Sequence, residues 1–495
     1  MLMAAPAVFN MDGFTSRCCR TFSGRAGIIF AGSVLGQGIA VLTLPIIARM
    51  YDAEILGRAA TVLAVVSISA LVVCLQYDQA VIVARAADLP YLLILSAGAA
   101  LAWAILFAAL VVLDATGLAL GRPHLLSSWG INWILPVLVF IYGIFTLLVN
   151  LGLRRNTLVR VSIGRLVYYG GGAVLQMIGS FLLEPRESVF LLAQGLAAFL
   201  AVCCLLPYRQ IVTWACESFG TRSTLAGVCR VAWTYEKFPK YQMGAGFINA
   251  VSIHMPVVFM RAVFSDAWAG WYYMAWRLLA SPTTLVSQAV GQVFYRDCAE
   301  RERAGMEQGP LVETVIAGLV RSSVPAAIAL AVAMPAAVDL LLGEAWMPVA
   351  NVLQVMLIAA KVTFFTSPVS TLLNVKGRQA SALRYFCILF GAGLFGLALG
   401  WRFQSQMVSV WGYSLARAFI LFLFLNHIVI SVNGRGRAIL NQVLPLIRDS
   451  GGVLALVAGL WLTRTLYEPS SLLVTFALLF LVFWRDIRRG GWRVA

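Results

Sequence analysis

Positively charged side chains inside long apolar stretches are the first feature of this sequence that could do chemistry. Four residues share this setting: Arg165, Arg277, Lys361 and Arg417. An ionisable residue within a membrane-spanning stretch is costly and points to a functional site. None of the 21 acidic residues lies clearly in the middle of such a stretch. We therefore expect these cations to meet an anionic substrate, and phosphate suits the bidentate fork of arginine.

The position of each cation within its stretch leaves more than one interpretation open. Arg165 lies only a few residues from the end of its stretch, where a long side chain can reach the cytoplasmic surface. Lys361 and Arg417 lie deeper, which favours a position facing a cavity. Three uncharged polar residues lie in two further stretches: Gln37, Asn249 and His254. They either line the same cavity or form hydrogen bonds between helices.

Sequence patterns of known catalytic chemistry are absent. The chain has no H-E-x-x-H, no Walker A sequence and no paired carboxylates within an apolar stretch, and it contains only three histidines. Because the chain has no nucleotide-binding motif, direct coupling to ATP is not expected. The sequence therefore predicts a transporter rather than an enzyme, with no metal or other cofactor.

The overall composition places these cations in a membrane. Of the 495 residues, 61% are hydrophobic and 12% are charged, whereas soluble proteins average roughly half apolar and about a quarter charged. Apolar stretches of about 20 residues recur, which is the length of a transmembrane helix. We predict an all-α polytopic membrane protein with about 14 transmembrane helices. The expected spans are 26–48, 59–77, 90–113, 131–153, 161–183, 188–207, 243–262, 269–292, 318–342, 349–372, 382–401, 407–430, 450–465 and 469–484.

The distribution of charge gives the orientation. With both termini in the cytoplasm, the inner segments hold 26 of the 37 Lys and Arg residues and the outer loops hold 7. This is the bias of the positive-inside rule. It also accounts for the net charge of +16, so no nucleic-acid partner is needed. None of the nine cysteines lies in a predicted outer loop, and a disulfide framework is not expected.

A short motif occurs twice and indicates a duplication. RMYDAEILGRAATVLAV (Arg49 to Val65) and VFSDAWAGWYYMAWRLL (Val263 to Leu279) each place an aromatic residue, an acid and a glycine before an apolar run. Aligning Gly57 with Gly270 gives an offset of 213 residues and puts both motifs on the outer side, six spans apart. Chance similarity is the alternative. Two parallel six-helix repeats would enclose a central cavity, and each glycine would allow a sharp turn and a close approach of helices.

Several stretches resemble one known family, the polysaccharide transporter and O-antigen flippase branch of the multidrug/oligosaccharidyl-lipid/polysaccharide exporter superfamily. They are the first span with its exit, GSVLGQGIAVLTLPIIARMYDAEILGRAA, and then QYDQAVIVAR, FPKYQ, GWYYMAWRLLASP and LLGEAWMPVANVLQVM. The similarity covers roughly residues 25 to 430. It implies two six-helix lobes arranged in a V, two additional C-terminal helices and alternating access. It also implies a polyprenyl-pyrophosphate-linked oligosaccharide as substrate, moved from the inner to the outer leaflet of the bacterial inner membrane.

The resemblance also implies that cationic residues lining the cavity meet the pyrophosphate. Arg277, Lys361 and Arg417 are the candidates, with Arg49 and Arg261 at the cavity mouths, and Arg165 is kept with them. The sequence departs from the superfamily pattern at the ion-coupling site, because no buried acid stands out. The expected partners are the lipid-linked oligosaccharide and membrane lipids, joined by a polysaccharide polymerase and a chain-length regulator of O-antigen or exopolysaccharide synthesis.

The expected organisation follows from the spans. It comprises a cytoplasmic N-terminus (1–25), an N-lobe (26–207), a cytoplasmic linker (208–242), a C-lobe (243–430) and a C-terminal region with the last two spans (431–495). Two other transporters remain as alternatives: a flippase of a peptidoglycan lipid precursor, and a drug exporter of the same superfamily. An integral-membrane polysaccharide polymerase is the alternative of a different class.

Overall fold

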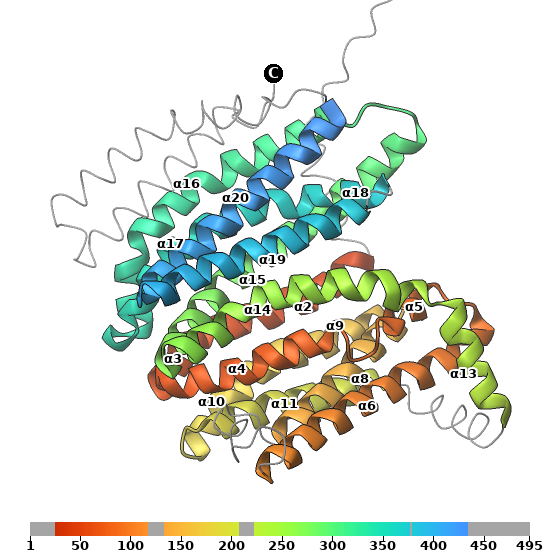
Figure 1. Ribbon diagram of the computed structural model, residues 1–495, viewed down its shortest axis with the longest axis horizontal. Coiled ribbons are helices and arrows are strands. Elements are labelled where there is room, and N and C mark those ends of the chain that lie inside the picture. Colours follow the sequence, from red (N-terminus) through yellow and green to blue (C-terminus); the bar gives the residue numbers. More distant parts are fainter. Residues whose placement is uncertain (1–24, 117–132, 207–221, 377–378, 434–495) are drawn as a thin grey trace, which may run out of the picture. The chain divides into compact units, whose positions relative to one another are not determined.

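The computed structural model describes residues 25–116, 133–206, 222–376 and 379–433, and all regular structure within these ranges is helical (Figure 1). The predicted all-α class is therefore confirmed. The expected spans 450–465 and 469–484 lie outside the described residues, as does most of the predicted N-terminal segment. Contacts within the chain divide the described residues into two compact units. We call residues 25–274 the N-terminal unit and residues 275–433 the C-terminal unit.

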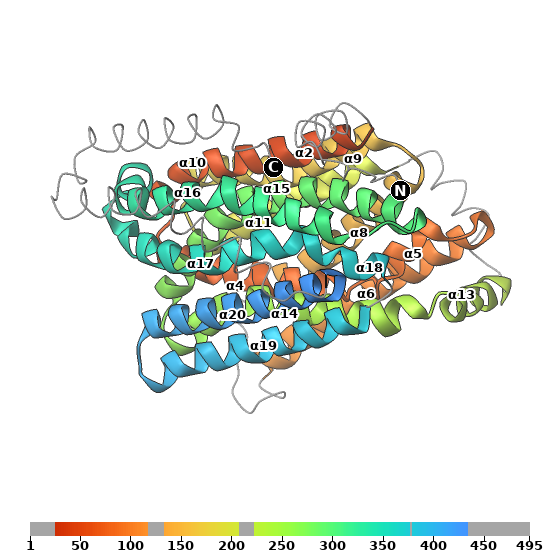
Figure 2. The same ribbon diagram turned by 90° about the horizontal axis from the view of Figure 1, so that it is seen from above.

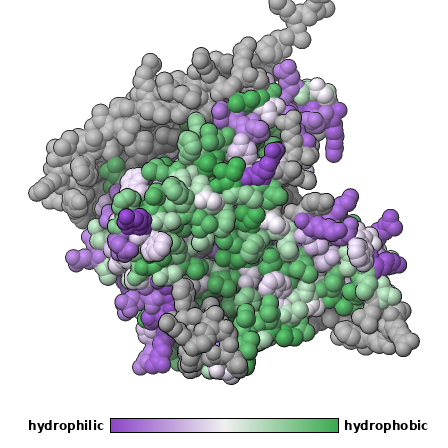
Figure 3. Space-filling view, in the orientation of Figure 1, coloured by the Kyte–Doolittle hydropathy of each residue, from purple (hydrophilic) through white to green (hydrophobic). Residues whose placement is uncertain are grey.

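Nine helices of the described residues are long and apolar enough to cross a membrane. They cover 31–50, 53–70, 86–115, 134–154, 187–205, 246–263, 344–370, 383–402 and 406–432. The expected spans 161–183, 269–292 and 318–342 are helical as well. Hydrophobic side chains cover most of the described surface visible in Figure 3, and hydrophilic ones gather near the ends of helices. This distribution fits helices embedded in lipid.

The N-terminal unit holds the first eleven labelled α-helices and the beginning of the twelfth. Its helices are α2 (Arg25–Leu42), α3 (Leu44–Met50), α4 (Ala53–Ala70), α5 (Tyr77–Val83), α6 (Leu89–Ala115), α8 (Ile134–Arg154), α9 (Leu158–Leu166), α10 (Gly172–Leu182), α11 (Glu187–Leu205), α13 (Arg222–Thr234) and α14 (Met243–Val263). Short 3-10 and π-helical segments are η1 (Ala86–Asp88), η2 (Val167–Gly171) and η3 (Phe238–Gln242). One buried core joins α5, α6, α8, α9 and α11, with Phe145, Leu151 and Val161 among its members.

The C-terminal unit continues from the middle of one very long helix. Its elements are α15 (Asp266–Arg303), α16 (Gly309–Leu342), η4 (Glu344–Trp346), α17 (Met347–Ser370), α18 (Leu372–Val375), α19 (Gln379–Arg402) and α20 (Gln406–Asn433). Helices α19 and α20 lie side by side along their length (Figure 2). Phe294, Leu311, Val369 and Ile428 belong to a core formed by α15, α16, α17 and α20. The 38 residues of α15 extend about 57 Å, which exceeds the hydrocarbon thickness of about 30 Å.

The second span begins and ends earlier than the hydropathy pattern predicts. The expected range is 59–77, but α4 covers Ala53–Ala70 and is followed by a turn. Leu75 and Gln76 have positive φ angles of 49° and 61°, and the Gln76 side chain donates a hydrogen bond to the Leu71 carbonyl at 2.7 Å. The turn is as apolar as the helix, so hydropathy alone does not reveal it.

Helix boundaries repeat with the spacing of the duplicated motif. Helix α3 ends at Met50 and α14 ends at Val263, and helix α4 begins at Ala53 and α15 begins at Asp266. Both pairs of boundaries differ by 213 residues, from 50 to 263 and from 53 to 266. The two copies of the motif therefore form the same helix–corner–helix structure.

The thiol of Cys298, beyond the predicted span in α15, should resist modification. Cys298 is fully buried, and burial, with Asp297 adding to it, raises the pKa of its thiol to about 12. The thiol is then protonated at pH 8 and inert, whereas Cys229 is exposed. We expect iodoacetamide to modify Cys229 in the folded protein and Cys298 only after denaturation, as measured by peptide mass spectrometry. Equal rates at the two sites would contradict the packing of α15.

Candidate functional site

The two copies of the repeated glycine pack against each other. A Cβ atom on Gly57 would collide with the carbonyl oxygen of Asp266 and would lie 2.9 Å from the backbone nitrogen of Gly270. A Cβ atom on Gly270 would collide with the carbonyl oxygen of Ala53 and lie 3.1 Å from its Cα. Ala53 and Asp266 are themselves equivalent in the repeat. The contact is thus reciprocal, as in a two-fold symmetric interface, and it requires glycine at both positions.

An aromatic residue anchors the first of these corners. Tyr51 is 1% exposed, its ring meets Phe190 edge-on at 5.4 Å, and its hydroxyl donates to the carbonyl of Gln176 at 3.2 Å. These contacts fix the junction of α3 and α4 against α10 and α11. The equivalent aromatic residue, Phe264, packs on Phe259 within its own corner.

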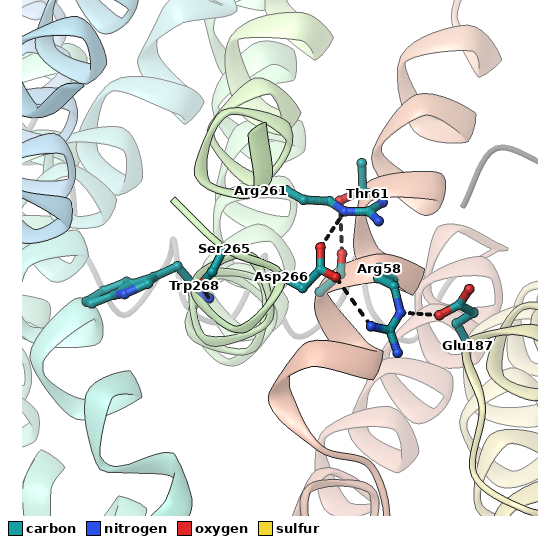
Figure 4. Close-up of polar contacts among 8 residues, drawn as sticks. Arg58, Thr61, Glu187, Arg261, Ser265, Asp266 and Trp268 are labelled. Atoms are coloured by element: carbon teal, nitrogen blue, oxygen red, sulfur yellow. Dashed lines mark hydrogen bonds and ion pairs between the residues drawn. The ribbon is translucent and has the colours of Figure 1, made fainter. Parts of the chain in front are cut away.

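Charged side chains from four helices join beside the glycine contact (Figure 4). Arg58 of α4 forms ion pairs with Glu187 of α11 and, at 3.3 Å, with Asp266 of α15. The other carboxylate oxygen of Asp266 accepts a hydrogen bond from Arg261 of α14 at 2.6 Å. We call this set of four residues, together with Gly57 and Gly270, the four-helix corner. Three ion pairs hold it together: Arg58–Glu187, Arg58–Asp266 and Arg261–Asp266.

Local helix chemistry favours charges at these positions. Glu187 and Asp266 lie in the first turns of their helices, where the helix dipole stabilises negative charge. Ser265 precedes α15 and accepts the backbone N–H of Trp268 at 3.2 Å, as an N-cap residue does. Arg261 lies in the last turn of α14, where the dipole stabilises positive charge. Glu187, Asp266 and Arg261 are therefore each favoured by the end of the helix that carries them, whereas Arg58 lies in the second turn of α4 and is held by its two carboxylate partners.

Because the Arg261 side chain is buried, loss of the Arg261–Asp266 pair should destabilise the network more than loss of its other pairs. The Arg261 side chain is 6% exposed, whereas those of Arg58, Glu187 and Asp266 are about 30% exposed. A buried guanidinium that loses its carboxylate has no water to replace it. Asp266 holds two arginines at once, so the corner depends on this carboxylate more than on Glu187.

The predicted cations of the N-terminal unit have different surroundings. Arg261 is bound to Asp266 in the four-helix corner. Arg49, near the end of α3, is exposed. Arg165 extends from α9 towards α2, where its Nη1 lies 3.4 Å from the hydroxyl oxygen of Ser33. Arg165 therefore has a hydrogen-bond partner on α2, and its role stays a prediction.

The remaining predicted cations belong to the C-terminal unit, on three different helices. Arg277 lies on α15 and is partly buried. Lys361 of α17 is also partly buried, and its Nζ lies 5.4 Å from the ring centre of Phe364, within the range of a cation–π contact. Arg417 of α20 donates to the Tyr413 hydroxyl at 3.5 Å. Their role in substrate binding stays a prediction.

The uncharged polar residues predicted for a cavity are partly buried on two helices. Gln37 lies on α2, and Asn249 and His254 lie on α14. Helix α14 continues through Pro256 and packs against α4. Their place along a substrate path stays a prediction.

Sequence reasoning missed three members of the four-helix corner: Arg58, Glu187 and Asp266. The motif did contain part of the signal, because it places an acid close before each repeated glycine, Glu54 before Gly57 and Asp266 before Gly270. The pairing itself joins residues 129 and 208 positions apart, which no local pattern reveals. Within the described residues, no group of three or more His, Cys, Asp or Glu side chains is placed to hold a metal ion.

Comparison with solved structures identifies the class of protein that this fold defines. A lipid II flippase, MurJ, in an inward closed conformation matches with a TM-score of 0.60 and 12% identity over 96% of this chain and 99% of that chain. A MOP superfamily transporter from Pyrococcus furiosus matches with a TM-score of 0.53 and 13% identity over 82% and 96%. A multidrug resistance MATE family transporter of the same superfamily matches with a TM-score of 0.51 and 15% identity over 84% and 95%. The chain has the fold of MOP superfamily transporters.

One known protein family matches part of the chain. Residues 189–351 match the family described as polysaccharide biosynthesis protein, and this range includes Arg261, Asp266 and Gly270 of the four-helix corner. No curated protein matches the chain. The family match and the fold together confirm the resemblance to the polysaccharide transporter and flippase family.

Proposed function

We propose that the protein is a flippase that moves a polyprenyl-pyrophosphate-linked oligosaccharide across the bacterial inner membrane for surface polysaccharide synthesis. The observation that carries the proposal is the match of residues 189–351 to a polysaccharide biosynthesis family within a chain that has a flippase and transporter fold. The cations on membrane-spanning helices support it, because a pyrophosphate supplies the anionic partner that arginine binds in bidentate fashion.

Transport of such a substrate requires both sides of the protein to open in turn. The four-helix corner holds α4, α11, α14 and α15 together at one end of their spans. By the positive-inside distribution this end faces outwards. We propose that the corner closes the outer side while substrate is taken up from the inner leaflet, and that it separates for release. A separating contact must be strong enough to seal and weak enough to open, which suits a network in which one buried guanidinium, that of Arg261, is combined with partners that are about 30% exposed.

Transport itself provides the direct test. Purified full-length protein is reconstituted into liposomes that carry a fluorescent polyprenyl-pyrophosphate-linked oligosaccharide, and the fraction protected from a membrane-impermeant quencher is followed over time. We expect protein-containing vesicles to exchange the lipid between leaflets faster than empty vesicles. Exchange at the rate of empty vesicles for every glycan tested would contradict the proposal.

Loss of a single cation should reduce transport without loss of protein. Arg277→Gln and Arg417→Gln each remove a charge-assisted hydrogen-bond donor, and such a bond contributes about 1.5–3 kcal/mol. We expect surface glycan to fall by about tenfold or more while the amount of protein in the membrane is unchanged. Arg384→Gln is the matched control, because Arg384 is exposed near the start of α19. Normal surface glycan in both variants would remove these residues from the substrate site.

The orientation can be tested separately. We propose that both termini face the cytoplasm, as the excess of Lys and Arg in the inner segments indicates. An alkaline phosphatase reporter fused after Ala495 should then be inactive, and a fluorescent protein at the same position should be bright. An active phosphatase there would reverse the orientation of every span, and with it the side that the four-helix corner closes.

A peptidoglycan lipid precursor is the second candidate substrate, and the similarity to MurJ over almost the full length favours it. The same liposomes loaded with a fluorescent lipid II distinguish the two, since the faster exchange identifies the substrate. A drug exporter would require acidic groups for cationic amphiphiles, whereas Glu187 and Asp266 are already paired with arginines. A polysaccharide polymerase and a chain-length regulator remain proposed partners, to be sought by cross-linking in cells.

A further inference from the structure

Three tyrosines of the N-terminal unit form one aromatic cluster within the membrane-spanning helices. The ring of Tyr168 stacks on Phe145 at 4.7 Å with an angle of 18°. Tyr142 and Tyr169 meet Tyr168 edge-on at 5.6 Å and 5.0 Å. Phe145 is buried and covers one face of the stack, whereas Tyr142 and Tyr168 are partly exposed and Tyr169 is 37% exposed. We call Tyr142, Tyr168 and Tyr169 the tyrosine platform.

An unusual backbone conformation builds this platform. Tyr168 and Tyr169 lie in the π-helical segment η2, between α9 and α10, and π-helical turns are frequently found at functional sites. The wider turn directs two consecutive tyrosines towards neighbouring helices. Gly36 of α2 provides the space, because a Cβ atom there would lie 3.1 Å from the Cβ of Tyr169. Gly36 of α2 and the extra residue of the π-helical turn thus both contribute to the position of the exposed Tyr169 ring.

Polar groups surround the same rings. Gln194 of α11, which packs against η2, accepts a hydrogen bond from the Gln176 side chain at 3.3 Å. Arg165 lies in the last turn of α9, directly before η2, and its Nη1 lies 3.4 Å from the Ser33 hydroxyl oxygen on α2. Three phenol groups, an amide and one cation therefore belong to helices that pack together around η2, where hydrocarbon could satisfy none of them.

This combination fits one ligand chemistry. A pyranose presents apolar C–H faces, which pack on aromatic rings, and a rim of hydroxyls, which pair with phenol and amide groups. A neighbouring guanidinium adds a site for a phosphate oxygen. Phenylalanines would pack equally well within a helix bundle, so the hydroxyls on all three rings indicate a polar occupant.

We propose that the tyrosine platform binds the sugar next to the pyrophosphate of the lipid-linked substrate, with Arg165 holding the adjacent phosphate. This inference rests on the proposed function. It adds that the protein recognises a sugar ring as well as the anionic group. Tyr169 supplies the most accessible aromatic face, and Tyr168, stacked on Phe145, supplies hydroxyl contacts.

Binding of defined probes to the purified full-length protein in lipid nanodiscs tests the proposal. The probes are farnesyl pyrophosphate, a panel of farnesyl pyrophosphates that each carry one pyranose, and the free sugars. We expect wild type to bind at least one sugar-bearing probe more tightly than farnesyl pyrophosphate. Tyr169→Leu should weaken that probe by about fivefold to tenfold and leave farnesyl pyrophosphate unchanged. Arg165→Gln should weaken both by about tenfold or more.

Two further variants distinguish a loss of sugar binding from a general loss of folding. Tyr169→Phe keeps the ring and should retain most of the affinity for the sugar-bearing probe. Tyr295→Leu removes an exposed tyrosine of α15 and should change neither affinity, and the melting temperature of each variant is measured in the same preparation. Two results would contradict the proposed sugar binding by the tyrosine platform. One is that the sugar adds no affinity in wild type, and the other is that Tyr169→Leu weakens both pyrophosphate probes equally. If wild type binds neither probe, the proposed function itself fails.

Discussion

Replacing Asp266 with asparagine should open the four-helix corner. The change removes the negative charge that pairs with Arg58 and Arg261, and the Arg261 side chain is only 6% exposed. Breaking a buried pair in this way costs about 3–5 kcal/mol, which corresponds to a change of more than a hundredfold in the ratio of closed to open corners. We expect surface glycan to fall steeply, because a flippase that does not close its outer side cannot complete its cycle.

Thiol labelling measures the opening directly. Ala269 lies beside Asp266 and is fully buried, so Ala269→Cys reports exposure of the corner to a membrane-impermeant maleimide. Labelling should be slow in the otherwise unchanged protein and fast with Asp266→Asn. Glu184→Gln provides the control, because the Glu184–Arg186 pair is mostly exposed and such pairs contribute little. If Asp266→Asn leaves both labelling and surface glycan at the control level, the network does not hold the corner closed.

Alanine in place of Gly57 or Gly270 should also open the four-helix corner and reduce transport strongly. Here the cause is a steric collision and not the loss of an ion pair. Either Cβ atom would collide with a backbone carbonyl oxygen of the opposite helix, and backbone atoms cannot move aside as the end of a flexible side chain can. Overpacking of this kind costs about 1–3 kcal/mol. Because the contact is reciprocal, we expect the two variants to reduce transport and increase labelling at position 269 to nearly the same extent.

The matched control is Gly38→Ala on α2, where a Cβ atom would meet nothing within 4 Å. It introduces the same methyl group into a membrane-spanning helix without a collision. Normal transport is expected, with slow labelling at position 269. Equal behaviour of Gly38→Ala and Gly57→Ala would show that the close approach of α4 and α15 has no part in the transport cycle.

The sequence predicts the helices well, because their main cause is local. Apolar stretches of sufficient length must become helices in lipid, and the repeated glycine correctly indicated a place where helices approach closely. The predicted limits of the second span, 59–77, were wrong because the turn from Leu71 to Gln76, which follows α4, is as apolar as the helix. The spans beyond residue 433 and the lobe boundaries stay predictions.

The candidate site is harder to predict because its causes are not local. The ion pairs of Arg58 join residues more than a hundred positions apart, so they appear only when the helices are assembled. The π-helical segment η2 has no hydropathy signal either, since it adds one residue to a turn within a continuous apolar helix. The role of Arg165 stays a prediction, and its contact with Ser33 could not be predicted because it depends on the packing of α2.

The reciprocal glycine contact also bears on how such a chain could arise. A half-length ancestor could have joined two identical corners through these glycines, as symmetric dimers do. The ion pairs do not share that symmetry: Ala53 occupies the position equivalent to Asp266, and Trp271 the position equivalent to Arg58. In two identical chains every charge would occur on both sides of the axis. A single polypeptide is free of that constraint, and here a symmetric glycine contact is combined with ion pairs that occur on one side only.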